Sequence, residues 1–164
     1  MKRKIAICPG TFDPFTNGHL DLVARGLRIF DEIIVAIAPS FKKKPLFTVE
    51  ERLAMIKESL KHFDRVRYEV FNSLLVEYVK KEKGIAIIRG LRAVSDFEYE
   101  LQMALMNRRL HSEIETVFMM PSEEYSFLTA TIVKEIASLG GSVRDLVPEP
   151  VENALKELYR QGKN

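Results

Sequence analysis

Short apolar runs alternate along the chain with stretches whose apolar residues recur every three or four positions. The apolar runs predict buried strands, at residues 4–8, 33–38, 66–71, 85–88 and 115–119. The periodic stretches predict helices, which start near residues 17, 48, 74, 95, 129 and 150. Strict alternation of strands and helices favours a parallel sheet with helices on both faces. The pattern therefore predicts an α/β fold with a doubly wound sheet of five parallel strands.

Local signals at the helix starts sharpen this prediction. Asn17 is expected to cap the first helix, because its side chain can accept a hydrogen bond from a free backbone N–H group. Thr48 with Glu51, and Ser95 with Glu98, have the spacing of capping boxes. Both boxes are expected to open helices.

The composition is that of an ordinary globular chain. The 164 residues are 46% apolar and 29% charged, which excludes a disordered or collagen-like protein, and the length predicts one domain over residues 1–164. The net charge of +2 is too small to indicate nucleic acid or an anionic membrane as partner. Cys8 is the one cysteine, so no disulfide forms within the chain. No export signal or long apolar span is evident, and we expect a cytoplasmic protein.

Chemistry-bearing residues follow the predicted strands, at the sheet edge where ligands of such folds bind. The loop after the first strand is rich in glycine and proline and ends at His19, at the start of the first helix. A helix N-terminus attracts phosphate and disfavours added positive charge, so we expect a lowered pKa for His19. A neutral His19 would still donate one hydrogen bond to a phosphate oxygen.

Further polar segments follow the fourth and fifth strands. Arg89 and Arg92 flank a glycine turn, where two guanidinium groups could converge on phosphates. Glu100 lies on the edge of the next helix, and its carboxylate is either a ligand contact or the partner of an arginine. Hydroxyl and N–H groups at the helix start within residues 121–131 could bind phosphates as well.

Two of these segments carry a family resemblance. The block PGTFDPFTNGH at residues 9–19 resembles the signature of the nucleotidyltransferase superfamily, and its last four letters have the form typical of phosphopantetheine adenylyltransferases. The block RGLRAVSDFEYE at residues 89–100 closely resembles a second block of that family. Together with the segment around Lys43 and with residues 121–131, these blocks make four motifs of the family, which occur in the family's order along the chain. The chain thus resembles the bacterial phosphopantetheine adenylyltransferase family over essentially its full length.

The resemblance implies a Rossmann-like fold and the reaction of ATP with 4′-phosphopantetheine, which gives 3′-dephospho-coenzyme A and pyrophosphate. Direct in-line displacement without a covalent intermediate is expected, because the acceptor phosphate is already an anionic nucleophile. The resemblance also implies Mg²⁺ as cofactor, a homohexamer and feedback inhibition by coenzyme A.

The family's functional residues correspond to three groups of positions in this chain. The catalytic group comprises His19, as transition-state stabiliser, Lys43 and Arg92. The group that binds phosphopantetheine comprises Thr11, Lys43, Leu75 and Arg89. The group that binds ATP comprises Thr11, Phe12, His19, Gly90, Leu91, Arg92, Glu100, Tyr125, Ser126, Phe127, Leu128, Thr129, Ala130 and Thr131. No side chain is expected to bind a metal. The chain departs from the family at residues 129–131, where Thr-Ala-Thr replaces a serine-rich run.

Two alternatives stay open at this point. The first is another nucleotidyltransferase, acting on nicotinate mononucleotide or transferring a cytidylyl group to glycerol phosphate, although the block at residues 89–100 argues against it. The second is a non-catalytic nucleotide-binding module on the same fold. The presence of His19, Lys43 and Arg92 argues against that module.

Overall fold

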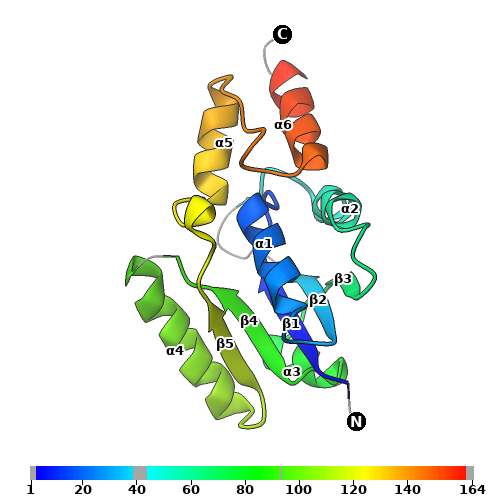
Figure 1. Ribbon diagram of the computed structural model, residues 1–164, viewed down its shortest axis with the longest axis vertical. Helices are drawn as coiled ribbons and strands as arrows, with labels where there is room; N and C mark the ends of the chain where they lie inside the picture. Colours follow the sequence, from blue (N-terminus) through cyan, green and yellow to red (C-terminus); the bar gives the residue numbers. More distant parts are fainter. Residues whose placement is uncertain (1–2, 39–43, 93, 162–164) are drawn as a thin grey trace.

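The computed structural model describes residues 3–38, 44–92 and 94–161. Within these residues, five strands form one parallel sheet in the order β3-β2-β1-β4-β5. The strands are Ile5–Gly10 (β1), Glu32–Ile37 (β2), Val66–Val70 (β3), Ala86–Gly90 (β4) and Glu115–Met119 (β5). The helices are Asn17–Gly26 (α1), Val49–Ser59 (α2), Leu75–Lys81 (α3), Val94–Leu110 (α4), Ala130–Ser138 (α5) and Glu149–Gln161 (α6), with a 3₁₀ turn at Glu123–Tyr125 (Figure 1). The predicted five-stranded parallel sheet is confirmed.

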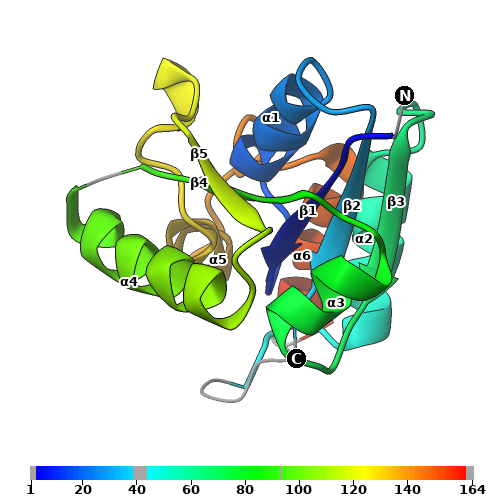
Figure 2. The ribbon, with the colours of Figure 1, turned by 90° about the horizontal axis from the view of Figure 1, so that it is seen from below.

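The apolar runs form strands because helices bury both faces of the sheet. Alternate residues of β2 enter different cores: Ile33 and Val35 pack with residues of α1, α2, α5 and α6, whereas Ile34 packs with residues of α3. Figure 2 shows α3 and α4 on the opposite side of the sheet from α1. The doubly wound arrangement is therefore as predicted.

The strand order reverses between β1 and β4, and these two strands separate toward their carboxyl ends. β1 pairs with β2 over its whole length, from Ile5 to Gly10. It pairs with β4 only through Ala6 and Ile7. The carboxyl ends of β1 and β4 are thus not paired through their backbones. The sheet therefore opens at the point where such folds bind ligands.

The first and fourth helices begin differently from the prediction. The N-cap of α1 is Thr16 rather than Asn17, and its side chain accepts a hydrogen bond from the N–H group of His19. Asn17 instead binds the loop before α6, where its N–H group donates to the Leu146 carbonyl at 2.9 Å. The helix α4 begins at Val94, one residue before Ser95, and the Ser95 side chain that the predicted capping box requires lies outside the described part of the chain. Thr48 does cap α2, with the predicted box.

The helices α5 and α6 stand beyond the carboxyl ends of the strands (Figure 1). They pack on the same core as α1 and α2, through buried residues such as Val133 and Leu155. Among the described residues, no helix is long and apolar enough to cross a membrane. The position of α5 brings the segment that follows β5 over the open end of the sheet.

Candidate active site

A cavity of about 1040 Å³ opens at the carboxyl ends of the strands, where β1 and β4 separate. Its wall is formed by the loop after β1, by the turn after β4 with the first part of α4, and by parts of the segment from residue 121 to residue 134. Lys44 and Pro45 after β2, and Phe71 and Leu75 after β3, also line it. This is the edge at which the sequence predicts a site.

Most of the residues predicted for the site line this cavity. They are Thr11, Phe12, His19, Leu75, Arg89, Gly90, Arg92, Glu100, Tyr125, Leu128, Thr129, Ala130 and Thr131. Leu91, Ser126 and Phe127 are not part of its wall. Phe127 is 60% exposed, and the Ser126 hydroxyl donates to the Glu123 carbonyl. Lys43 lies outside the described residues.

The loop after β1 turns sharply around the ring of Phe12. Phe12 has a φ of 50° and is almost completely buried. A Cβ atom at Gly10 would lie 2.8 Å from its ring atom Cζ, so only glycine leaves room for the ring there. The glycine allows the Phe12 ring to fold back under the loop, and the turn holds Thr11 at the cavity.

His19 is fixed by the backbone at the start of α1. The Thr16 N–H group donates to His19 Nδ1 at 3.0 Å, so Nδ1 carries no proton in this arrangement. The ring also stacks on Phe15 and meets the edge of Phe12, with centroid distances of 5.5 Å and 5.1 Å. The proton of the neutral imidazole therefore resides on Nε2. Within the described part of the chain, no hydrogen bond is made by Nε2.

The pKa of His19 is lowered from 6.5 to about 3, first by burial and then by the charges of Arg92 and Arg89. The predicted direction of the pKa shift is confirmed, and burial is its largest cause, followed by the two arginine charges. At neutral pH the ring is an uncharged hydrogen-bond donor in the wall of the cavity. It cannot act there as a cationic acid.

Arg89 is held by Glu100 and by the loop after β1. Its Nε and Nη2 atoms donate to the Glu100 carboxylate at 2.8 Å and 2.5 Å, and Nη1 donates to the Pro9 carbonyl at 2.8 Å. Burial lowers the pKa of Arg89, but the hydrogen bonds and charge of Glu100 raise it more, so the net shift is upward. Of the two roles left open for Glu100, the structure shows the partner of an arginine.

Arg92 connects the turn after β4 with the segment that leads into α5. Its Nη1 atom donates to the Leu128 carbonyl at 2.9 Å, and Nε lies 3.3 Å from the Asp96 carboxylate. The side chain remains 37% exposed. Because the guanidinium group has five N–H donors, it has capacity left for a ligand in the cavity.

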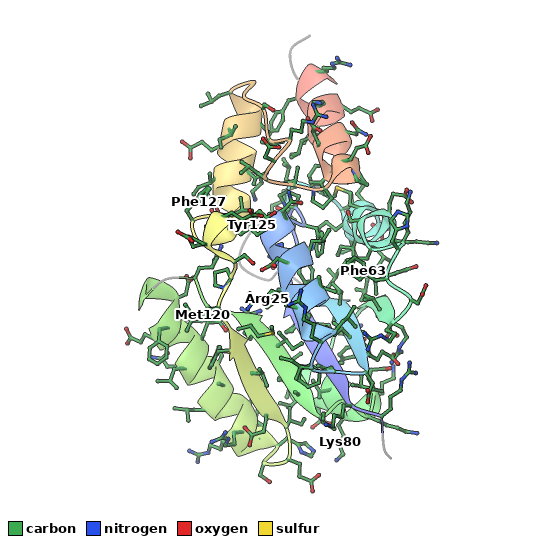
Figure 3. The ribbon with its side chains drawn as sticks, in the orientation of Figure 1. Arg25, Phe63, Lys80, Met120, Tyr125 and Phe127 are labelled. Atoms are coloured by element: carbon green, nitrogen blue, oxygen red, sulfur yellow. The ribbon has the colours of Figure 1, made fainter. Side chains whose placement is uncertain are left out.

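The segment after β5 is anchored on α1. Ser122 donates to the Asp21 carboxylate through its N–H group and its hydroxyl, at 3.2 Å and 2.9 Å. Figure 3 shows Arg25 of α1 beside Met120, whose carbonyl accepts from the Arg25 guanidinium. At the other end, the Thr129 hydroxyl caps α5 by accepting a hydrogen bond from the N–H group of Ile132 at 3.1 Å. The segment is thus fixed at both ends, and the start of α5 lies at the cavity.

Sequence reasoning missed the roles of two charged residues that support this site, Asp13 and Arg52. The Asp13 carboxylate accepts from the N–H groups of Leu46 and Phe47 at 2.9 Å and 3.0 Å and from Lys134 at 3.0 Å. Burial raises the pKa of Asp13, but these hydrogen bonds and the Lys134 charge lower it more, so the net shift is downward. Asp13 and Lys134 both line the cavity.

The second missed residue is Arg52, which is only 2% exposed and binds the Thr11 carbonyl. A signal for it was present in the sequence. Arg52 lies three and four positions before Met55 and Ile56, on the buried face of α2. A charged residue on an apolar helix face indicates a buried partner.

Comparison with known proteins relates the chain to nucleotidyl-transferring enzymes. Residues 7–136 match the family model described as cytidylyltransferase-like. The curated phosphopantetheine adenylyltransferase of Thermodesulfovibrio yellowstonii is 58% identical over 159 residues, which cover 96% of this chain and 99% of that protein. The protein of the same name from Geotalea daltonii is 55% identical over 161 residues, covering 98% of this chain and 100% of that protein.

Solved structures with low sequence identity share the fold. A bifunctional NMN adenylyltransferase/ADP ribose pyrophosphatase of Francisella tularensis superimposes with a TM-score of 0.70 at 19% identity. The match covers 98% of this chain and 52% of that one, so this chain spans about half its length. The lipopolysaccharide core biosynthesis protein of Thermoplasma volcanium gives a TM-score of 0.58 at 21% identity, over 74% of this chain and 100% of that one. At such identities the likeness concerns the fold alone.

Proposed function

From the premise that this chain belongs to the phosphopantetheine adenylyltransferase family, within the cytidylyltransferase-like nucleotidyltransferases, we propose how its residues carry out the reaction. The enzyme transfers the adenylyl group of ATP to 4′-phosphopantetheine in coenzyme A biosynthesis, and the products are 3′-dephospho-coenzyme A and pyrophosphate. One enzyme thus brings two polyanions together in one cavity.

We propose direct in-line displacement. An oxygen of the acceptor phosphate attacks the α-phosphorus of ATP, and the bond from that phosphorus to the bridging oxygen breaks, so that pyrophosphate leaves with the electron pair. The acceptor needs no general base, because it is already an anion. The one thiol at the cavity is no nucleophile, since burial raises the pKa of Cys8 to about 12. Catalysis then rests on positioning and on stabilisation of charge.

The observation that carries this proposal is the neutral, backbone-fixed ring of His19 in the same cavity wall as Arg89 and Arg92. Its Nδ1 atom is bound to the Thr16 N–H group, so the N–H group at Nε2 is available to an α-phosphate oxygen. A neutral donor strengthens its hydrogen bond as negative charge develops, with no proton to gain or lose. We assign His19 as transition-state stabiliser, with Lys43 and Arg92 as the cationic groups.

We propose that the two substrates occupy opposite ends of the cavity. The acceptor phosphate binds Thr11, Lys43 and Arg89, and the apolar side chains of Leu75 and Phe71 support its pantetheine arm. ATP binds Arg92 and the helix start of α5, which is capped by Thr129 and offers free N–H groups to phosphates. Ala130 offers only its backbone there. We further propose that Glu100 acts through Arg89, rather than as a direct ligand of ATP.

We propose that Mg²⁺ enters as part of the nucleotide substrate, bound to ATP phosphates and water. Among the described residues, no group of three or more His, Cys, Asp or Glu side chains could hold a metal ion. Mg²⁺ commonly keeps several waters and binds through substrate phosphates, which fits this set of residues. Positive charge from the metal would add to that of Arg89 and Arg92.

The homohexamer, the feedback inhibition by coenzyme A and the cytoplasmic location are further parts of the proposal. Association between copies is supported by exposed apolar side chains on α4, which are Phe97, Tyr99, Leu101, Met103, Leu105, Met106 and Leu110. Coenzyme A contains both a phosphopantetheine arm and an adenylate, so it would compete for the same cavity. Light scattering would give the mass of the assembly, and inhibition kinetics would show whether coenzyme A competes with phosphopantetheine.

One assay tests the central proposal. Purified protein is mixed with Mg²⁺, ATP and either 4′-phosphopantetheine, nicotinate mononucleotide or glycerol 3-phosphate, and pyrophosphate release is followed. A parallel set with CTP and glycerol 3-phosphate tests cytidylyl transfer. We expect release with phosphopantetheine alone, and a product with the mass of 3′-dephospho-coenzyme A. Release only with another acceptor would refute the assignment, and release with none would favour a binding module.

A further inference from the structure

The guanidinium group of Arg52 is buried without a carboxylate partner in the part of the chain that the structure describes. Arg52 is 2% exposed. Its Nη1 atom donates to the Thr11 carbonyl at 2.6 Å, and its Nε atom lies 3.1 Å and 3.2 Å from the carbonyls of Phe47 and Thr48. A buried cation is costly to desolvate, and its hydrogen bonds commonly do no more than offset that cost. Fold stability alone therefore gives little reason for a charge at this position.

Asp13 binds the backbone of the same residue, Phe47, through the preceding peptide group. Its carboxylate accepts from the N–H groups of Leu46 and Phe47, whereas Arg52 donates to the Phe47 carbonyl. Asp13 is itself 7% exposed. Both the N–H group and the carbonyl of Phe47 are thus bound to charged side chains. The two charges join the segment before α2 to the turn after β1.

This double attachment holds cavity residues on two segments at once. Thr11 is bound through its own carbonyl, and Lys44 and Pro45, which also line the cavity, directly precede the peptides that Asp13 binds. The helix α2 does not need these charges for its start, because Thr48 and Glu51 already form a capping box. The contacts of Asp13 and Arg52 therefore fix how the turn after β1 and the segment before α2 lie relative to each other.

We propose that Asp13 and Arg52 are positioning residues for the acceptor substrate, which set where Thr11 meets the phosphate of phosphopantetheine and hold the segment with Lys44 and Pro45 at the cavity wall. This inference rests on the proposed function, and it adds two residues that act through the backbone without touching substrate. On the ATP side, the segment after β5 has its own anchors in Asp21 and Arg25, and of the two proposed positioning residues only Asp13 also reaches α5, through its ion pair with Lys134. Loss of Arg52 should consequently affect the acceptor more than the nucleotide, whereas loss of the Asp13 charge also removes the partner of Lys134.

The experiment compares steady-state kinetics of Arg52→Met, Arg52→Lys and Asp13→Asn with wild type, with each substrate varied in turn. Glu115→Gln is the matched control, because it neutralises a carboxylate in an exposed ion pair with Arg108 at the first residue of β5. Circular dichroism and thermal unfolding establish that each variant is folded at the assay temperature. Arg52→Lys and Asp13→Asn carry the test if Arg52→Met does not fold.

We expect the KM for phosphopantetheine to rise about tenfold or more in Arg52→Met and Asp13→Asn, because each variant loses hydrogen bonds made by a charged group. In Arg52→Met the KM for ATP should stay within about threefold, and kcat should fall less than the phosphopantetheine KM rises. Arg52→Lys should lie between wild type and Arg52→Met, since its ammonium keeps the charge but not the planar fork. Glu115→Gln should match wild type.

Two results would overturn the inference. One is an unchanged phosphopantetheine KM in every folded variant of Arg52 and Asp13, and the other is an equal rise of both KM values in the Arg52 variants, which would indicate a merely structural role. Failure of the proposed function would look different, because wild type and Glu115→Gln would then release no pyrophosphate with phosphopantetheine. That outcome would overturn both the function and the inference that rests on it.

Discussion

Replacing His19 tests the central assignment, provided that its structural role is separated from its chemical one. His19→Ala removes the N–H donor at Nε2, and it also removes the acceptor Nδ1 that binds the Thr16 N–H group at 3.0 Å. The first loss is that of one preorganised donor, which typically costs 10² to 10³ in kcat, or about 2.7–4 kcal/mol. The second is the loss of half a capping box, which costs roughly 1 kcal/mol of stability. A single variant would mix the two effects.

His19→Gln separates them, because glutamine at this position of a capping box can accept from the same Thr16 N–H group. We expect His19→Gln to unfold near the wild-type temperature and His19→Ala to unfold earlier. Both should lose kcat, by about 10² to 10³ in the alanine variant, with only modest change in ATP affinity, since the interaction forms chiefly in the transition state.

The assay is pyrophosphate release at saturating ATP and phosphopantetheine, with thermal unfolding of the same samples. Wild-type turnover by His19→Ala would refute the assigned role. A rate loss in His19→Ala that disappears when the assay is run at a lower temperature, well below the unfolding midpoint of that variant, would assign the effect to the lost cap, and would equally refute it.

Two further predictions concern stability. Lowering the pH from 6.5 to 4.5 should lower the free energy of unfolding by up to about 2.3 kcal/mol through His19, because the unfolded chain binds a proton below pH 6.5 that the folded chain, with a pKa of about 3, does not. Urea unfolding at both pH values should show this loss in wild type and a smaller one in His19→Gln, and equal losses would contradict it. Gly10→Ala places a Cβ atom 2.8 Å from the Phe12 ring, and it should lower the stability by about 1–3 kcal/mol. Thermal unfolding measures this, and an unchanged midpoint would show that the ring moves freely.

The relation between sequence and fold is clearest at β2 and at the helix starts. The apolar run of β2 predicted a strand buried on both faces, and all six residues are buried. A continuous apolar run indicates that the strand is buried on both faces, whichever elements pack against it. Helix starts were less predictable, because Thr16 and Asn17 are both good capping residues. The choice of Thr16 follows from tertiary contacts, since Asn17 binds the carbonyls of Asp145 and Leu146 far along the chain.

The sequence by itself determined the class of fold, the loops that carry chemistry and the family to which those loops point. Each of these depends on neighbouring residues alone. Periodicity indicates which residues of one element are buried, and a motif such as residues 9–19 indicates the shape of one turn. Only the tertiary structure decided the partners, because Arg89 meets Glu100 across 11 positions and Arg52 meets Thr11 across 41. A pattern shows that a charged residue lies on a buried face, but not which group compensates its charge. Those partners depend on the strand order β3-β2-β1-β4-β5, which no local pattern contains.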